Sequence, residues 1–139
     1  MLITKLEVTW YPSSWGNWQT IDYPNPDWDT IQFWIECLDR DEIPFINLLI
    51  EQTPGDEGEF ILVVVGGYGE YLFEFYDRGY LLCYRDDSRS DRVVSIWKSD
   101  QGCFVSEKYL CNDIELVFII VRYFAETGKA FPGVNWTDD

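Results

Sequence analysis

The feature that most constrains the fold is a run of strand-like segments, separated by short turns, in the middle of the chain. The segments are rich in Ile, Val, Leu, Phe and Tyr and span 45–52, 59–65, 70–76, 79–84 and 92–98, with a further short one at 102–105. Turn-forming residues, mainly Gly, Asp, Pro and Ser, separate them. Links this short join antiparallel neighbours, because a parallel crossover needs a dozen or more residues. The sequence therefore predicts an antiparallel meander.

Two segments with helical spacing flank this run. In the first, 25–39, we expect Asn25 to cap the helix and Pro26 to lie in its first turn. In the second, Asn112 and Glu115 form a plausible capping box, and Gly128 marks the end. Each segment has one apolar face, as expected for helices that pack on a sheet.

The order of elements predicts the fold class. Residues 2–10 alternate between apolar and polar positions, as in a half-buried strand, whereas 11–26 has the composition of a loop. The chain thus contains a strand, a helix, about five strands, a helix and a tail. We expect a single α+β domain over 1–139, with an antiparallel sheet of five to seven strands in a meander and two helices packed on one face.

The charge balance limits the possible functions. The chain has 10 Lys and Arg, 25 Asp and Glu and no His, which gives a formal net charge of −15. Without His, triads and zinc sites that need an imidazole are excluded. A strongly negative surface disfavours direct binding to nucleic acid or anionic membranes and favours a basic partner.

The four cysteines indicate neither metal nor catalysis. Cys37, Cys83, Cys103 and Cys111 include no C-x-x-C pair, and no His is present to act as a base. The first ten residues resemble neither a signal peptide nor a membrane span. We expect reduced, buried thiols in a cytoplasmic protein, with no metal, cofactor or catalytic residue.

Two further patterns admit a functional interpretation. The glycine run at 66–69 resembles a phosphate-binding loop, but a strand follows it where such a loop needs a helix, so we expect a hairpin turn. Acidic residues gather at 39–42, 56–59 and 86–91, and paired carboxylates are the basis of many hydrolases. Most of these acids fall in predicted turns, where solvated side chains are the usual state.

Two tryptophans differ from the rest. Trp10, Trp34 and Trp97 lie on predicted strands or on the helix, which favours a core position. Trp15 and Trp18 instead lie in the polar loop. There they either fold back over the edge of the core or serve as binding anchors.

Two stretches of the chain resemble a known family. Residues 123–129, with Pro132 and Trp136 after them, give a Phe, Thr-Gly, Pro, Trp ending, and 65–79 contain a Gly-rich turn, an aromatic strand and an Asp-x-Gly turn. In these features the chain resembles immunity protein family one of bacterial polymorphic toxin systems, whose members are often paired with deaminase-type toxins. The resemblance implies an antitoxin that is not an enzyme and that neutralises a cognate toxin domain.

The acidic balance is compatible with that role, because a toxin that acts on nucleic acid presents a basic substrate surface. The predicted toxin-binding residues are acids in two turns together with the loop tryptophans: Trp15, Trp18, Asp56, Glu57, Glu59, Asp86 and Asp87. The alternatives are a small carboxylate-dependent hydrolase and an acidic DNA-mimic or regulatory binding module.

Overall fold

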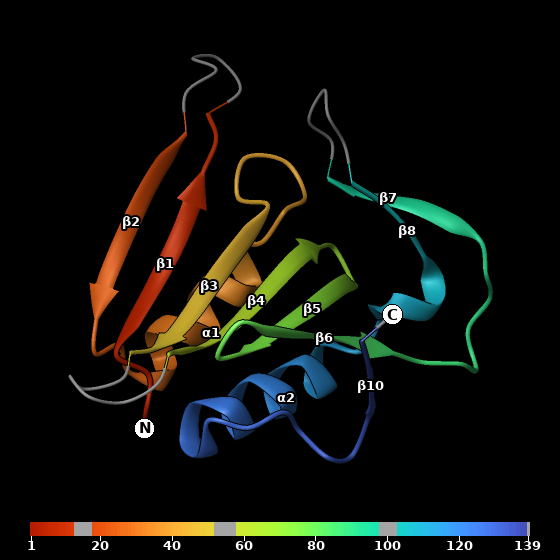
Figure 1. Ribbon diagram of the computed structural model, residues 1–139. Helices are drawn as coiled ribbons and strands as arrows, with labels where there is room; N and C mark the ends of the chain where they lie inside the picture. Colours follow the sequence, from red (N-terminus) through yellow and green to blue (C-terminus); the bar gives the residue numbers. More distant parts are fainter. Residues whose placement is uncertain (13–17, 52–57, 98–102, 139) are drawn as a thin grey trace.

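The computed structural model describes residues 1–12, 18–51, 58–97 and 103–138 (Figure 1). Along the chain its elements are β1 Lys5–Trp10, β2 Gln19–Pro24, α1 Trp28–Cys37, β3 Phe45–Ile50, β4 Phe60–Gly67, β5 Glu70–Asp77, β6 Tyr80–Arg85, β7 Val93–Trp97, β8 Cys103–Ser106, the 3-10 helix η1 Glu107–Tyr109, β9 Leu110–Cys111, α2 Ile114–Thr127 and β10 Asn135–Thr137. The predicted α+β class is confirmed.

The main sheet has eight strands, more than the expected five to seven. Its order is β10-β6-β5-β4-β3-β1-β2, with β9 paired to one end of β5, and every pair is antiparallel. The predicted meander is present as β3 to β6, whereas β7 and β8 leave the sheet and form a separate hairpin. The figure shows this hairpin beside the main sheet (Figure 1).

The strands that sequence reasoning missed are β2, β9 and β10. The expected loop at 11–26 contains β2, an edge strand whose Gln, Asp and Pro hide its alternation. The other two have 2 and 3 residues, too few to show a period. Their partners, not their own composition, make them strands.

The glycine run forms a hairpin turn, as predicted. Tyr68 and Gly69 have φ angles of 51° and 85°, the left-handed pair that a two-residue type I′ turn requires. Gly67 belongs to β4, and a Cβ atom there would lie 2.3 Å from the carbonyl oxygen of Leu38. The second glycine therefore permits close contact with the chain that follows α1.

Both helices begin later than predicted. The α1 cap is Asp27, whose carboxylate accepts a hydrogen bond from Thr30 N at 2.8 Å, whereas Asn25 adopts a left-handed φ before the helix. The α2 cap is Asp113 rather than Asn112. The predicted end at Gly128 is confirmed, because this residue is left-handed and its N–H bonds to the Phe124 carbonyl.

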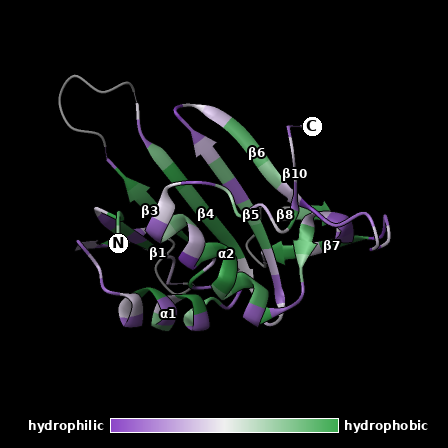
Figure 2. Cartoon of the chain, turned by 90° about the horizontal axis from the view of Figure 1, so that it is seen from below, coloured by the Kyte–Doolittle hydropathy of each residue, from purple (hydrophilic) through white to green (hydrophobic). Residues whose placement is uncertain are grey.

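The two helices cover one face of the sheet (Figure 2). Strand register places two rows of side chains on this face: Val8, Ile46, Val64 and Phe73 in one, and Leu6, Leu48, Leu62 and Phe75 in the other. These rows form one buried cluster with Ile31 and Ile35 of α1 and Val117, Ile120, Val121 and Phe124 of α2. This cluster is the main core.

Among the residues that the structure describes, no helix is both long enough and apolar enough to cross a lipid bilayer.

Candidate functional site

The face of the sheet opposite the helices is only partly covered. The β7–β8 hairpin packs on one row of side chains that runs across the strands: Thr9, Phe45, Val65, Leu72 and Leu110. Ile96 of β7 is fully buried against this row. The neighbouring row through Glu7, Asn47 and Glu74 is only half-buried. This face therefore has a small second core beside an open surface.

Four aromatic rings meet where the hairpin adjoins the sheet. We call this group the aromatic end: Tyr11, Trp18, Phe45 and Trp97. The Trp18 ring centroid lies 4.7 Å from that of Tyr11, 5.2 Å from that of Trp97 and 6.1 Å from that of Phe45. Trp18 nevertheless remains 49% exposed. Trp18 therefore packs in part against other rings, while about half of its surface faces solvent.

Strand pairing brings these rings together from three parts of the chain. In the β1–β2 pair Trp10 lies opposite Gln19, so Tyr11 and Trp18 are the next residues outward. Phe45 begins β3, and Trp97 ends β7 beside a β-bulge. The buried Trp97 Nε1 has no hydrogen-bond partner in the described part of the chain. The sequence placed Trp97 on a strand but could not show its neighbours.

Acidic residues border the aromatic end. The Tyr11 N–H donates to the Glu42 carbonyl at 2.7 Å, which fixes the 39–44 loop beside the rings. One Asp39 carboxylate oxygen accepts from the N–H groups of Asp41 and Ile43, both at 2.9 Å, and Asp41 is exposed. The backbone of this acidic loop therefore lies beside Tyr11, whose ring packs on Trp18. Sequence reasoning noted the acids of this loop but not as part of a site, because their position depends on the pairing of β1 with β3.

Arg40, the cation of this loop, is held by backbone carbonyls of the β4–β5 turn. The Arg40 guanidinium donates to the carbonyls of Gly67 at 2.6 Å and Tyr68 at 2.9 Å. It holds the β4–β5 turn against the loop that follows α1. The aromatic end thus combines a half-exposed indole with an anchored acidic loop.

The predicted contact residues are only partly described. Trp15, Asp56 and Glu57 lie outside the described residues, whereas Glu59, Asp86 and Asp87 are described. Glu59 precedes β4, at the opposite end of that strand from Val65, the partner of Phe45. At about 3.3 Å per residue the two ends are roughly 20 Å apart. Glu59 and Trp18 therefore do not form one site.

The second acidic turn is also separate from the aromatic end. Asp86 accepts hydrogen bonds from Ser88 N at 3.0 Å and from Ser88 Oγ at 2.6 Å, and these bonds hold the pKa of Asp86 below its usual value. Asp87 pairs with Arg85 at 2.6 Å. The Asp86 N–H donates to the Lys108 carbonyl, which places this turn beside η1, at the base of the hairpin.

Ion pairs fix that base to the sheet. Arg89 Nη1 donates to Glu70 at 2.8 Å and to the Leu110 carbonyl at 2.9 Å, and Arg89 Nη2 donates to Glu107 at 3.0 Å. The hydrogen bond that Arg92 donates to Glu107 lowers the pKa of this carboxylate. Its effect outweighs that of burial, which acts in the opposite direction. Arg89 therefore links β5, β9 and η1.

The three described thiols show no sign of activation. Cys37, Cys83 and Cys111 are free, and Cys111 is buried. Burial raises the pKa of each of these three thiols, which disfavours the reactive thiolate. The Cys103 side chain lies outside the described structure.

Three pockets on the described surface do not offer the paired acids that a carboxylate hydrolase needs. Their volumes are about 640, 210 and 250 Å³, and among their described lining residues each has a single carboxylate: Asp77, Glu115 and Asp86, respectively. A glycosidase-type site needs two. The described residues also contain no group of three or more His, Cys, Asp or Glu that could hold a metal ion. The hydrolase alternative gains no support from these pockets.

Comparison with known proteins identifies a fold but no family. No protein-family model and no curated protein matches the chain. Among solved structures, the chain is similar to one described as a hypothetical protein from Neisseria gonorrhoeae, with a TM-score of 0.61 and 15% sequence identity over 95% of this chain and 94% of that one. This similarity shows a shared fold along nearly the full length of both chains.

Proposed function

We propose that this protein is an immunity protein that binds a cognate bacterial toxin domain in the cytoplasm and neutralises it. The toxin would be a nucleic-acid-targeting deaminase or nuclease, and inhibition would occlude its basic substrate surface. The observation that carries the proposal is the half-exposed Trp18, packed on three other rings and bordered by the acidic 39–44 loop. The net charge of −15 and the resemblance to immunity protein family one support the same role.

The aromatic end has the properties of a binding anchor. Large aromatic side chains carry much of the binding energy at protein interfaces, especially when less important polar contacts surround them. Because Trp18 already packs against Tyr11 and Trp97, little side-chain freedom is lost when a partner covers it. Asp41 and Glu42 would then face Lys or Arg of the toxin, and their charges would also speed association at low salt.

Two placements of the interface can be separated by experiment. In one, the toxin contacts the aromatic end. In the other, it contacts the predicted acids at Glu59, Asp86 and Asp87, which lie at two other places on the molecule. We favour the first because it joins an aromatic anchor to acids in one surface.

The decisive experiment co-expresses the protein with the toxin encoded next to it and measures growth and complex formation. We expect rescue of growth by the wild type. Trp18→Ala should weaken the complex by about 2–4 kcal/mol, the range of an interface hot spot. The doubly reversed Asp41→Lys, Glu42→Lys variant should weaken it further and should flatten the dependence of the association rate on salt.

Phe33→Ala is the matched control. Phe33 is 55% exposed and packs on Trp34 at 5.1 Å, but it belongs to α1 on the helix-covered side. Its loss should leave affinity unchanged. Absence of both rescue and complex would reject the immunity role. Full affinity in the Trp18 variant, with a loss on reversal of Glu59 or of Asp86 and Asp87, would move the interface to the predicted turns.

A further inference from the structure

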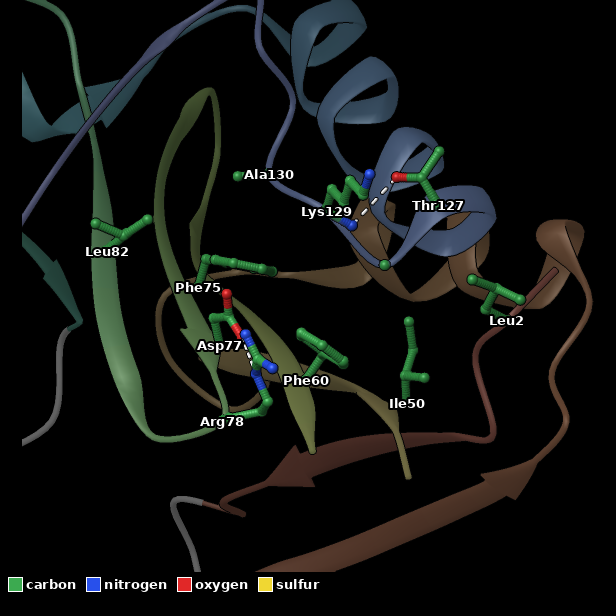
Figure 3. A pocket seen from close by; sticks show the side chains of 11 residues that line it. Leu2, Ile50, Phe60, Phe75, Asp77, Arg78, Leu82, Thr127, Lys129 and Ala130 are labelled. Atoms are coloured by element: carbon green, nitrogen blue, oxygen red, sulfur yellow. Dashed lines mark hydrogen bonds and ion pairs between the residues drawn. The ribbon is translucent and has the colours of Figure 1, made fainter. Parts of the chain in front are cut away.

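The largest of the three pockets lies away from the aromatic end, between the last turn of α2 and the sheet. Its walls are mainly apolar and come from separate elements (Figure 3). The apolar lining residues are Leu2, Ile50, Phe60, Phe75, Leu82 and Ala130. A volume of about 640 Å³ lies within the range of pockets that bind small molecules, roughly 300–1,000 Å³. The pocket therefore has the size and the apolar character of a ligand site.

The backbone around this pocket is firmly held. Leu2 N donates to the Ala125 carbonyl at 2.6 Å, which ties the start of the chain to α2. The Gly128 N–H bonds to the Phe124 carbonyl at 2.8 Å, and the Thr127 hydroxyl donates to the Tyr123 carbonyl at 2.7 Å. Three carbonyls near the end of α2 thus already have donors.

Among the described residues, the polar lining of this pocket includes one cation without an ion pair. Asp77 is bonded to Arg78 at 2.8 Å, so these two charges offset each other. Lys129 also lines the pocket, and its ammonium group pairs with no described residue. Every other described Lys or Arg pairs with a carboxylate or, in Arg40, donates to carbonyls. An unpaired lysine is notable in a chain with this excess of acid.

We propose that this pocket binds a small amphiphile with an apolar chain and a single carboxylate, such as a medium-chain fatty acid. The apolar walls would cover the chain, and Lys129 would pair with the carboxylate. Of the other polar lining residues, Asp77 is bonded to Arg78, and the Thr127 hydroxyl is bonded to the Tyr123 carbonyl, which disfavours a sugar or a nucleotide. This site is independent of the proposed toxin interface, because it uses none of the same residues.

The test uses three ligands that share an eight-carbon chain and differ in the head group: octanoate, octanol and octylammonium. Binding is followed by the methyl NMR signals of Leu2, Ile50, Leu82 and Ala130. We expect octanoate to shift these signals saturably and to bind more tightly than the other two. Across hexanoate, octanoate and decanoate, each added CH₂ should lower the Kd about twofold to fourfold.

Two variants test the head group and the walls separately. Lys129→Gln should weaken octanoate about fivefold and leave octanol unchanged, whereas Lys5→Gln, the same charge change on β1, should have no effect on either. Ala130→Phe should fill the pocket and block all three ligands. If Ala130→Phe does not fold, the Lys129→Gln variant still tests the proposal, because Lys129 is exposed and its replacement should not disturb folding.

The proposal is overturned if octanoate leaves the four methyl signals unchanged, or if octanol and octylammonium bind as tightly as octanoate. Equal loss in Lys129→Gln and Lys5→Gln would also overturn it. None of these measurements involves a toxin, so their failure would leave the proposed immunity role untouched, and the reverse also holds.

Discussion

On the helix side of the sheet, Phe73, Leu62 and Leu48 are buried beneath two helices, whereas on the opposite side the β7–β8 hairpin covers one row and leaves Trp18 half exposed. The first region is one large continuous cluster of buried apolar side chains. The second has three buried residues, Val65, Ile96 and Leu110, and depends on ion pairs at the hairpin base. We infer that the helix side contributes most of the stability, whereas the opposite side provides the surface that a partner can contact.

The largest expected effect is a loss of the helix-side core. Phe73 is fully buried, and its ring lies 6.0 Å from Tyr84 and 6.4 Å from Trp136. Phe73→Ala should lower the free energy of unfolding by about 3–5 kcal/mol. The half-buried Phe45 of the aromatic end is the matched residue, and Phe45→Ala should cost about 1–2 kcal/mol. Urea unfolding measures both, and equal costs would contradict the proposed division.

A smaller effect is expected where the two regions meet. In Gly67→Ala the new Cβ would clash with the Leu38 carbonyl oxygen, and φ is already 134°. We expect a loss of about 2–3 kcal/mol in thermal or urea unfolding. Gly69→Ala is the control, because it has a left-handed φ but nothing within 4 Å of the added atom, so only about 1 kcal/mol should be lost. Similar losses in both would show that backbone strain, not the contact with Leu38, determines the cost.

Acid should loosen the hairpin before the helix-side core. Hydrogen bonds from Ser88, Lys108 and Arg92 lower the pKa values of Asp86, Asp91 and Glu107, respectively. Because these pKa values are lower in the folded state, the carboxylates stabilise it above their ordinary values of 3.8 and 4.5. That contribution is lost as the pH falls below this range.

Hydrogen exchange, corrected for the intrinsic effect of pH, measures this loss. Between pH 6 and about 3 the amides of the β7–β8 ladder, such as that of Val94 opposite Val105, should lose protection, while that of Leu48 in β3 should keep it. Simultaneous loss at both amides would mean that the hairpin and the main core open together.

The smallest effect is expected at an exposed pair on α2. Arg122 and Glu126 are 3.1 Å apart, and both side chains are more than half exposed. Glu126→Ala should change the free energy of unfolding by less than about 0.5 kcal/mol, because solvent and salt screen such a pair. A larger loss in urea unfolding would show that surface ion pairs, and not only the buried core, contribute to the stability of the helix side.

Much of the fold could be predicted from local patterns. The β4–β5 and β5–β6 hairpins follow from Tyr68-Gly69 and Arg78-Gly79 between alternating strands, and the end of α2 follows from Gly128. The edge strand β2 could not be predicted, since its hydrogen bonds to β1 outweigh a loop-like composition. The helix starts were misplaced by one or two residues because several Asn and Asp side chains nearby are all suitable caps.

The candidate site was less accessible to such reasoning. Trp18 stood out because a large aromatic in a polar loop needs either a core edge or a partner. Its neighbours Phe45 and Trp97 come from strands far along the chain, and the acidic 39–44 loop lies beside the aromatic end only through the pairing of β1 with β3. Tertiary contacts also place Glu59 and Asp86 at different positions on the molecule, which the sequence could not show.

The sequence by itself determined the class of fold and the sign of the surface charge, because periodicity, turn chemistry and composition act over a few residues or over the chain as a whole. Only the tertiary structure decided which aromatic rings meet, which acidic loop lies beside them and which cation among the described residues has no ion pair. Those are distances between residues far apart in sequence, and strand register and helix packing set them.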